Sequence, residues 1–321
     1  MRRLTTSQGK VGRMDAMPVS RAPFFTLVSL IGQSQLRKMV RDGLPLSLRS
    51  PFQFLLNGKA EPEDCQVAAR IEHLRFELAK RENDFVTTFS DTGPRPTPRQ
   101  WFSPENSPQI RSRVRSLPQV AYVSSVLPRW GIFLYLCGNA TRAKTILELG
   151  SSAGISGCYL ASGKYCQRFV TVEGSPELSI LAETHLRQIA NNFEVVNAPF
   201  NAALEKILPS LRDGLDMVYM DGEKDKRAAL HCFERLTPYL NNRCVVVFDD
   251  IHWSSQMREV WQELCRWKGL SFAINAGRFG VCLWSGGTAR PKVYDLFMVA
   301  GVDLYEIKQR FEDLRTWWSR G

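Results

Sequence analysis

The sequence predicts an α/β fold in which a doubly wound, mostly parallel sheet of seven strands follows a helical N-terminal extension. Two observations carry this prediction. Strand and helix patterns alternate regularly from about residue 119 onward, and several of the strand segments are apolar on both faces. A third observation, the short connection between the last two strands, predicts that the seventh strand is antiparallel.

Each strand candidate is a short apolar run bounded by turn residues. The run "CVVVF" shows the pattern best, because a parallel sheet covered by helices needs apolar residues on both faces. Helical patterns separate the runs at 175–190, 225–240 and 254–267, and Ser254 or Ser255 is placed to cap the last of these. The predicted strands are 144–150, 168–174, 193–197, 215–221, 243–249, 270–275 and 279–285.

The last two strands lie within "LSFAINAGRFGVCLW". They are joined through Asn-Ala-Gly-Arg, which is too short for a crossover helix. The seventh strand is therefore expected to run antiparallel to the sixth.

Composition divides the chain into four regions. We expect a basic N-terminal segment at 1–50, a helical extension with a Pro/Arg-rich loop at 51–118, the sheet domain at 119–286 and a C-terminal extension at 287–321. Within the second region, residues 62–80 have one apolar helical stripe, which predicts a helix. Residues 91–118 contain six prolines, which predict a loop. The C-terminal extension is a possible homodimer contact.

Charge and cysteine content limit the function classes. The net charge of +10 arises in residues 1–143, but no RGG run or basic–aromatic repeat accompanies it, so nucleic acid is not the expected partner. Eight scattered cysteines without a CxxC pair predict reduced thiols and a cytoplasmic location. Four unclustered histidines argue against zinc, and no apolar run is long enough for a transmembrane segment.

The turn after the first strand, in "TILELGSSAGISG", predicts the kind of ligand. A dinucleotide would favour GxGxxG, but this turn is GxxxG and has Ser152 at the place of the second glycine. Glu173, which ends the second strand 23 residues after Gly150, suits a ribose diol. The pattern favours a nucleoside ligand without a pyrophosphate, and S-adenosylmethionine fits that description.

The run "ILELGSSAGISG…TVEG…DMVYMDG…VVVFDDIHW" resembles the class I S-adenosylmethionine-dependent methyltransferases. It is most similar to the bacterial O-methyltransferase-like group, distantly similar to catechol O-methyltransferases. The resemblance implies a Rossmann-like fold and methylation of a small hydroxylated acceptor, a class that includes aromatic ones. It also implies that the cofactor contacts Glu148, Gly150, Ser151, Ser152, Gly154, Glu173, Asn197 and Asp221.

The segment "MDGEK" raises the question of a metal, because catechol-type enzymes bind magnesium through an Asp at this strand end. The resemblance implies a Mg²⁺ or other divalent cation site formed by Asp221, Asp249 and Asp250. It also implies Lys224 as the base that removes the acceptor's proton, if burial and the metal depress its pKa. His252 is an alternative base.

Two residues depart from the family pattern. Asp250 stands where the acid–amide pair has Asn, and the closer bacterial group more often has His at the position of Lys224.

Other functions stay open at this point. They are an RNA or protein methyltransferase that uses the basic N-terminal region, a non-catalytic S-adenosylmethionine-binding protein, and a nicotinamide-linked oxidoreductase.

Overall fold

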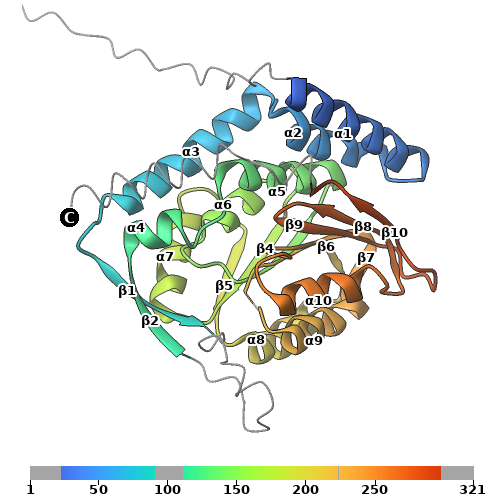
Figure 1. Cartoon of the computed structure of the whole chain (residues 1–321). Helices are drawn as coiled ribbons and strands as arrows, with labels where there is room; N and C mark the ends of the chain where they lie inside the picture. Colours follow the sequence, from blue (N-terminus) through green and yellow to red (C-terminus); the bar gives the residue numbers. More distant parts are fainter. Residues whose placement is uncertain (1–22, 91–110, 223, 298–321) are drawn as a thin grey trace, which may run out of the picture.

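A central eight-stranded sheet with helices on both faces forms the body of the protein (Figure 1). The computed structural model describes residues 23–90, 111–222 and 224–297. The predicted doubly wound fold is confirmed, with one strand more than the seven expected. The strands are β3 (Thr145–Leu149), β4 (Arg168–Glu173), β5 (Phe193–Asn197), β6 (Leu215–Met220), β7 (Leu240–Phe248), β8 (Leu270–Ala276), β9 (Phe279–Trp284) and β10 (Lys292–Asp295).

The order of strands across the sheet is β10-β8-β9-β7-β6-β3-β4-β5. The chain runs outward from β3 through β4 to β5 and then returns to β6 on the other side of β3. The order therefore reverses between β3 and β6, whose carboxyl ends lie side by side. Ligands of such sheets bind at this reversal point.

Strand β9 is antiparallel to both of its neighbours, β7 and β8, as the sequence predicted. The connection is shorter than expected, because β8 extends to Ala276 and only Gly277 and Arg278 form the turn. Gly277 has φ +87°, as a two-residue hairpin turn that begins with glycine requires. This turn brings Arg278 to the edge of the sheet where β7 ends.

The eighth strand was missed by the sequence analysis. Residues 287–321 were expected to form an extension outside the domain, but β10 lies within them and pairs in parallel with β8. Its four residues are too few for a recognisable alternation pattern.

Helices cover both faces of the sheet because alternate strand residues point to opposite sides. On one face α5 and α6 bury Ile146, Met217 and Tyr219, and α7 packs beside α6. On the other face, α8, α9 and α10 bury Leu147 and Val218. The helices are α5 (Pro128–Thr141), α6 (Ile155–Ala161), α7 (Pro176–Leu186), α8 (Phe200–Ile207), α9 (Lys226–Leu236) and α10 (Ser255–Leu264), which Ser254 caps.

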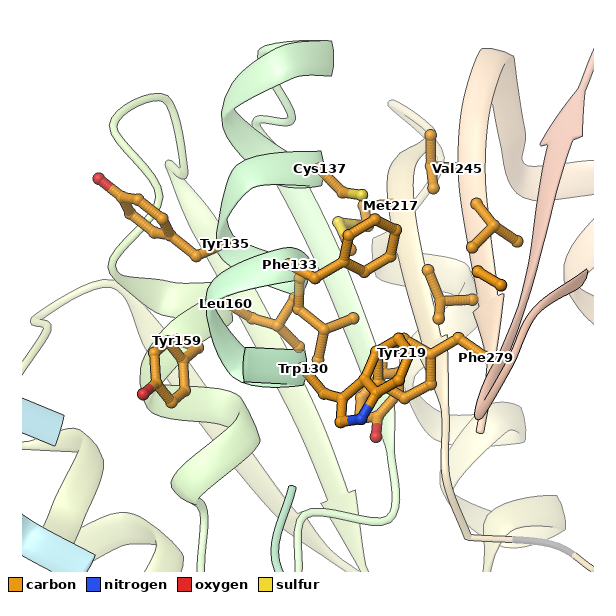
Figure 2. Close-up of a cluster of buried hydrophobic side chains, with 14 of the residues drawn as sticks. Trp130, Phe133, Tyr135, Cys137, Tyr159, Leu160, Met217, Tyr219, Val245 and Phe279 are labelled. Atoms are coloured by element: carbon orange, nitrogen blue, oxygen red, sulfur yellow. The ribbon is translucent and has the colours of Figure 1, made fainter. Parts of the chain in front are cut away.

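Aromatic side chains fill the core between α5 and the sheet (Figure 2). The ring centroid of Phe279 lies 4.8 Å from that of Trp130 and 5.7 Å from that of Tyr219. All three side chains are almost completely buried. These ring contacts hold Phe279, the strand residue next to Arg278, in place.

The N-terminal region contributes to the same core. Its described part contains α1 (Pro23–Arg41), a 3₁₀ turn at Leu46–Leu48, α2 (Arg49–Asn57) and α3 (Pro62–Ala79). Leu36, Met39 and Phe52 are buried together with residues of α5. The segment 1–50 was predicted only as a basic region, but its residues Leu36, Met39, Leu44 and Leu48 are buried in the core.

The prediction of a continuous loop at 91–118 is wrong at its C-terminal end. Strand β2 (Arg111–Ser116) pairs antiparallel with β1 (Phe85–Ser90), and α4 (Leu117–Tyr122) follows it. The sequence "RSRVRS" gives no apolar alternation, so the strand was not recognised. The rest of the predicted loop, 91–110, lies outside the described residues.

All eight cysteines are free, as predicted. Among the helices of the described ranges, none has the length and apolar character needed to cross a membrane.

Candidate active site

The glycines after β3 allow three chain segments to approach closely. A Cβ atom on Gly150 would lie 2.7 Å from the Cα of Gly222, which follows β6. A Cβ on Gly154 would lie 2.7 Å from the Cα of Ala182 in α7. Both glycines also have positive φ, at +98° and +81°. Both glycines predicted at this turn are therefore needed by the protein's own packing.

Polar atoms in the same turn lack partners. Within the described ranges, the buried side-chain oxygens without a hydrogen bond are Oε1 of Glu148, Oγ of Ser151 and Oγ of Ser152. They lie within five consecutive residues of the sequence. Buried polar atoms are normally hydrogen-bonded, so a cluster of unpartnered ones indicates a ligand.

Glu148 is fully buried at the end of β3. Its Oε2 accepts a hydrogen bond of 2.7 Å from the hydroxyl of Thr171. Burial raises the pKa of the Glu148 carboxyl to about 7, against the hydrogen bonds from Ser156 and Thr171 that lower it. A cationic group bound beside Oε1 would favour the ionised form.

Glu173 ends β4 beside this turn, as predicted. Its carboxylate accepts backbone N–H bonds from Ser152 at 2.8 Å and from Ser175 at 2.9 Å. Burial raises the pKa of Glu173, and these backbone bonds oppose the shift. A carboxylate has about four acceptor positions, so the backbone bonds leave room for a ligand hydroxyl. Asn197 is exposed at the end of β5 and donates its amide to the Glu173 carbonyl at 2.8 Å.

The three acids predicted to bind a metal do lie together at the ends of β6 and β7. One carboxylate oxygen from each of Asp221, Asp249 and Asp250 lies within 4.8 Å of the others. Asp249 is completely buried, whereas the side chains of Asp221 and Asp250 are 16% and 26% exposed. Burial and then the charge of Asp249 raise the pKa of Asp221 well above its usual range.

Arg278 is the residue that the sequence analysis missed. Its Nε and Nη2 donate to the two oxygens of Asp249 at 2.6 Å each, which is a bidentate pair. Burial alone would raise the pKa of Asp249, but the Arg278 guanidinium lowers it strongly. The segment "LSFAINAGRFGVCLW" contained this arginine, and the antiparallel connection placed it at the correct edge of the sheet. These two observations together were the available signal.

Two further donors complete the contacts of Asp249. The hydroxyl of Tyr219 donates to its Oδ2 at 2.9 Å, and the backbone N–H of Asp250 donates to its Oδ1 at 2.6 Å. Tyr219 also lies 3.3 Å from Oδ2 of Asp221 and so links the two acids.

Lys224 is a cation in this cluster. Its Nζ lies 3.1 Å from Oδ1 of Asp221 and 3.4 Å from Oδ2 of Asp250. Burial lowers the pKa of Lys224, but the three carboxylates more than reverse this and raise it above its ordinary value. The depressed pKa that a general base would need is therefore not found.

The other predicted side chains lie around the cluster. The Nε2 of His252 is 3.2 Å from Oδ1 of Asn275, and its ring contacts Phe297 at 5.0 Å. His185 is a buried histidine, and its Nδ1 lies 2.7 Å from the carbonyl of Ala153. Trp253 is 70% exposed, and its backbone N–H donates to the carbonyl of Asp250 at 2.9 Å.

The donor set does not fit a divalent cation as it stands. Both oxygens of Asp249 are used by Arg278, and Lys224 contacts the other two acids. A metal at this place would need the carboxylates to give up these charge-assisted bonds.

Comparison with known proteins supports the resemblance read from the motifs. Residues 147–251 match a family model described as a methyltransferase domain. A catechol O-methyltransferase from Mycobacterium tuberculosis is 35% identical over 122 residues, which are 37% of this chain and 52% of that protein. The chain thus spans about half the length of the curated relative it matches. Over residues 147–251, the match agrees with the resemblance to methyltransferases that the motifs indicated.

The chain also aligns with solved structures over about half of its length. An O-methyltransferase from Bacillus cereus in complex with SAH aligns over 51% of this chain and 84% of that chain, with 21% identity and a TM-score of 0.45. The O-methyltransferase TomG from Streptomyces achromogenes, in complex with SAM, aligns over 50% and 82%, with 23% identity and a TM-score of 0.43.

Proposed function

We propose that this chain is an S-adenosylmethionine-dependent methyltransferase that methylates an oxygen of a small hydroxylated acceptor. The observation that carries the proposal is the cluster of unpartnered buried oxygens at Glu148, Ser151 and Ser152, next to Glu173. The match of residues 147–251 to a methyltransferase domain supports it. No specific observation favours the RNA, protein or non-catalytic alternatives.

The residues of the turn suit S-adenosylmethionine. Glu148 and the two serines would hold the charged aminoacyl part, and Glu173 would accept the ribose hydroxyls. Asn197 at the end of β5 stays a proposed adenine contact. When bound, the cofactor supplies an electrophilic methyl group on a sulfonium, whose sulfur keeps the bonding electron pair when the methyl leaves.

The acid cluster suits the acceptor hydroxyl. Asp221 has a raised pKa, so its carboxylate takes up a hydroxyl proton more readily than an ordinary aspartate. The Lys224 ammonium, held by Asp221 and Asp250, stabilises the negative charge that develops on the oxygen. The exposed ring of Trp253 offers a flat apolar surface to an aromatic acceptor. His252 stays an alternative base.

The divalent cation implied by the resemblance has no part in this scheme. The cluster already contains two cations that contact all three carboxylates. The positive charge beside the acceptor oxygen comes from Lys224 in our proposal.

Calorimetry with S-adenosylhomocysteine tests the cofactor site. We expect one bound nucleoside per chain for the wild type, and at least about tenfold weaker binding for Glu173→Ala because the ribose acceptor is lost. Glu183→Gln is the matched control, since Glu183 pairs with Arg187 on the exposed side of α7. Absence of binding by the wild type would contradict the proposal.

Transfer of a labelled methyl group to a panel of catechols and phenols tests the chemistry. Lys224→Met is expected to lower kcat by about a hundredfold, the usual cost of losing one charge-stabilising donor. Binding of S-adenosylhomocysteine should change little in this variant. A Lys224→Met enzyme with wild-type kcat would remove lysine from the mechanism.

A further inference from the structure

The buried acid Asp249 has no coordination position left for a metal. Its two oxygens accept four hydrogen bonds, from Arg278 Nε and Nη2, the Tyr219 hydroxyl and the Asp250 backbone N–H. A carboxylate offers about four acceptor positions, so all are used. The three donor groups are themselves held in place by the fold.

Arg278 is locked where it lies. It occupies a two-residue turn, its carbonyl accepts the backbone N–H of Ile251 at 3.3 Å, and the next residue, Phe279, is fully buried against Trp130. A guanidinium stays protonated at every pH at which proteins fold. The charge beside Asp249 is therefore permanent in both sign and position.

The positive charge of the cluster matches what a divalent cation would bring. Arg278 and Lys224 carry two positive charges, and their nitrogens lie 2.6 to 3.6 Å from oxygens of the three acids. A cation coordinated by all three acids would lie within a few ångströms of both nitrogens. Repulsion at such a distance is strong in a partly buried site.

We infer that the Arg278–Asp249 pair and Lys224 take the place of the divalent cation, so that this chain transfers methyl groups without a metal. The inference rests on the proposed function. Arg278 acts as a positioning residue, because it holds Asp249 and leaves Lys224 as the cation nearest the acceptor side. Lys224 lowers the pKa of the acceptor hydroxyl by charge, as a coordinated metal would.

Binding of Mn²⁺ to the full-length protein, followed by the loss of the free-ion EPR spectrum, tests the inference without any activity measurement. We expect no stoichiometric binding by the wild type after treatment with a chelator. Arg278→Gln frees Asp249 and removes one charge, so it should bind Mn²⁺ at least about tenfold more tightly than the wild type. Lys226→Gln is the matched control, since Lys226 pairs with Glu259 away from the acids. It should behave as the wild type.

Stoichiometric Mn²⁺ binding by the wild type would overturn the inference, and so would a folded Arg278→Gln protein that binds no more Mn²⁺ than the wild type. If Arg278→Gln does not fold, Mn²⁺ titrations of the wild type and of Lys224→Met test the inference instead. Lys224→Met also removes a cation from the cluster, so its affinity for Mn²⁺ should rise. Methyl transfer should be the same with a chelator and with added Mg²⁺, and loss of activity with the chelator would overturn the inference. Failure to bind S-adenosylhomocysteine would instead contradict the proposed function. The Mn²⁺ titration would still show whether the cluster binds a divalent cation.

Discussion

The turn after β3 and the acid cluster after β6 and β7 lie at the same edge of the sheet but differ in how their polar atoms are satisfied. At the turn, three buried oxygens have no partner. At the cluster, every carboxylate has a cationic partner, and Asp249 has four hydrogen bonds. The difference indicates that the turn is completed by a ligand, whereas the cluster is completed by the protein itself.

The largest expected effect is on stability and comes from breaking the satisfied cluster. Asp249→Ala leaves the Arg278 guanidinium without its bidentate partner, and loss of one member of such a buried pair typically costs about 3–5 kcal/mol. Urea unfolding measures this change. The double variant Asp249→Ala, Arg278→Met should recover part of the loss, since no unpaired charge remains. Additive losses would show that the two side chains are not coupled.

The turn with unpartnered oxygens predicts that the free energy of unfolding depends on pH. Here the cause is a buried carboxyl without a cationic partner, in contrast to the paired acids of the cluster. Glu148 has a pKa of about 7 in the folded protein, above its ordinary value of 4.5, so the folded state holds the proton over this interval. The contribution of Glu148 to the free energy of unfolding is fully present below the unfolded pKa of 4.5. It falls as the pH rises, and the loss amounts to about 3 kcal/mol once the pH exceeds 7.

Unfolding of wild type and Glu148→Gln at several pH values isolates this contribution, because the other titrating groups are common to both proteins. The stability of the variant should fall less between pH 4 and pH 8. Equal slopes in the two proteins would show that the Glu148 carboxyl is not perturbed. Saturating S-adenosylhomocysteine should flatten the wild-type slope, since its ammonium favours ionised Glu148.

The packing of the turn predicts a smaller effect. Gly154→Ala places a Cβ 2.7 Å from the Ala182 backbone at φ +81°, which should cost about 2–3 kcal/mol. Gly43→Ala separates the two causes, because Gly43 has φ +105° but no heavy atom near its Cβ position. It should cost about 1 kcal/mol. Gly174 has open space around its Cβ position and no positive φ, so Gly174→Ala should change stability by less than about 0.5 kcal/mol.

The same contrast explains what the sequence could predict. The turn was recognised because its residues are consecutive and their spacing is read directly from "ELGSSAG". The three acids were also expected to meet, because the family resemblance implied it, and the structure shows that they follow adjacent parallel strands. The Arg278–Asp249 pair was not predicted, since it joins residues 29 positions apart through the register of an antiparallel strand.

Local sequence also failed where elements are stabilised only by their partners. Strand β10 has four residues and forms against β8, and β2 has a polar sequence that forms against β1. Both depend on pairing with another segment and not on their own periodicity. The condition set for Lys224 as the base, a depressed pKa, is not met for a related reason. Burial was considered, but the number of carboxylates that contact the ammonium depends on the folded cluster.

The smallest expected effect concerns His252, which lies at the margin of the cluster. Its ring contacts Asn275 near the end of β8 and Phe297 after β10, while Lys224 contacts the acids directly. His252→Gln keeps a side-chain amide that can reach Asn275, so kcat/KM for methyl transfer should fall by less than about threefold. A pH–rate profile of the variant should keep the wild-type shape, because the proposed proton acceptor is Asp221 and not the imidazole. A loss as large as that of Lys224→Met, or disappearance of one limb of the profile, would make His252 the base and reduce Asp221 to a partner of Lys224.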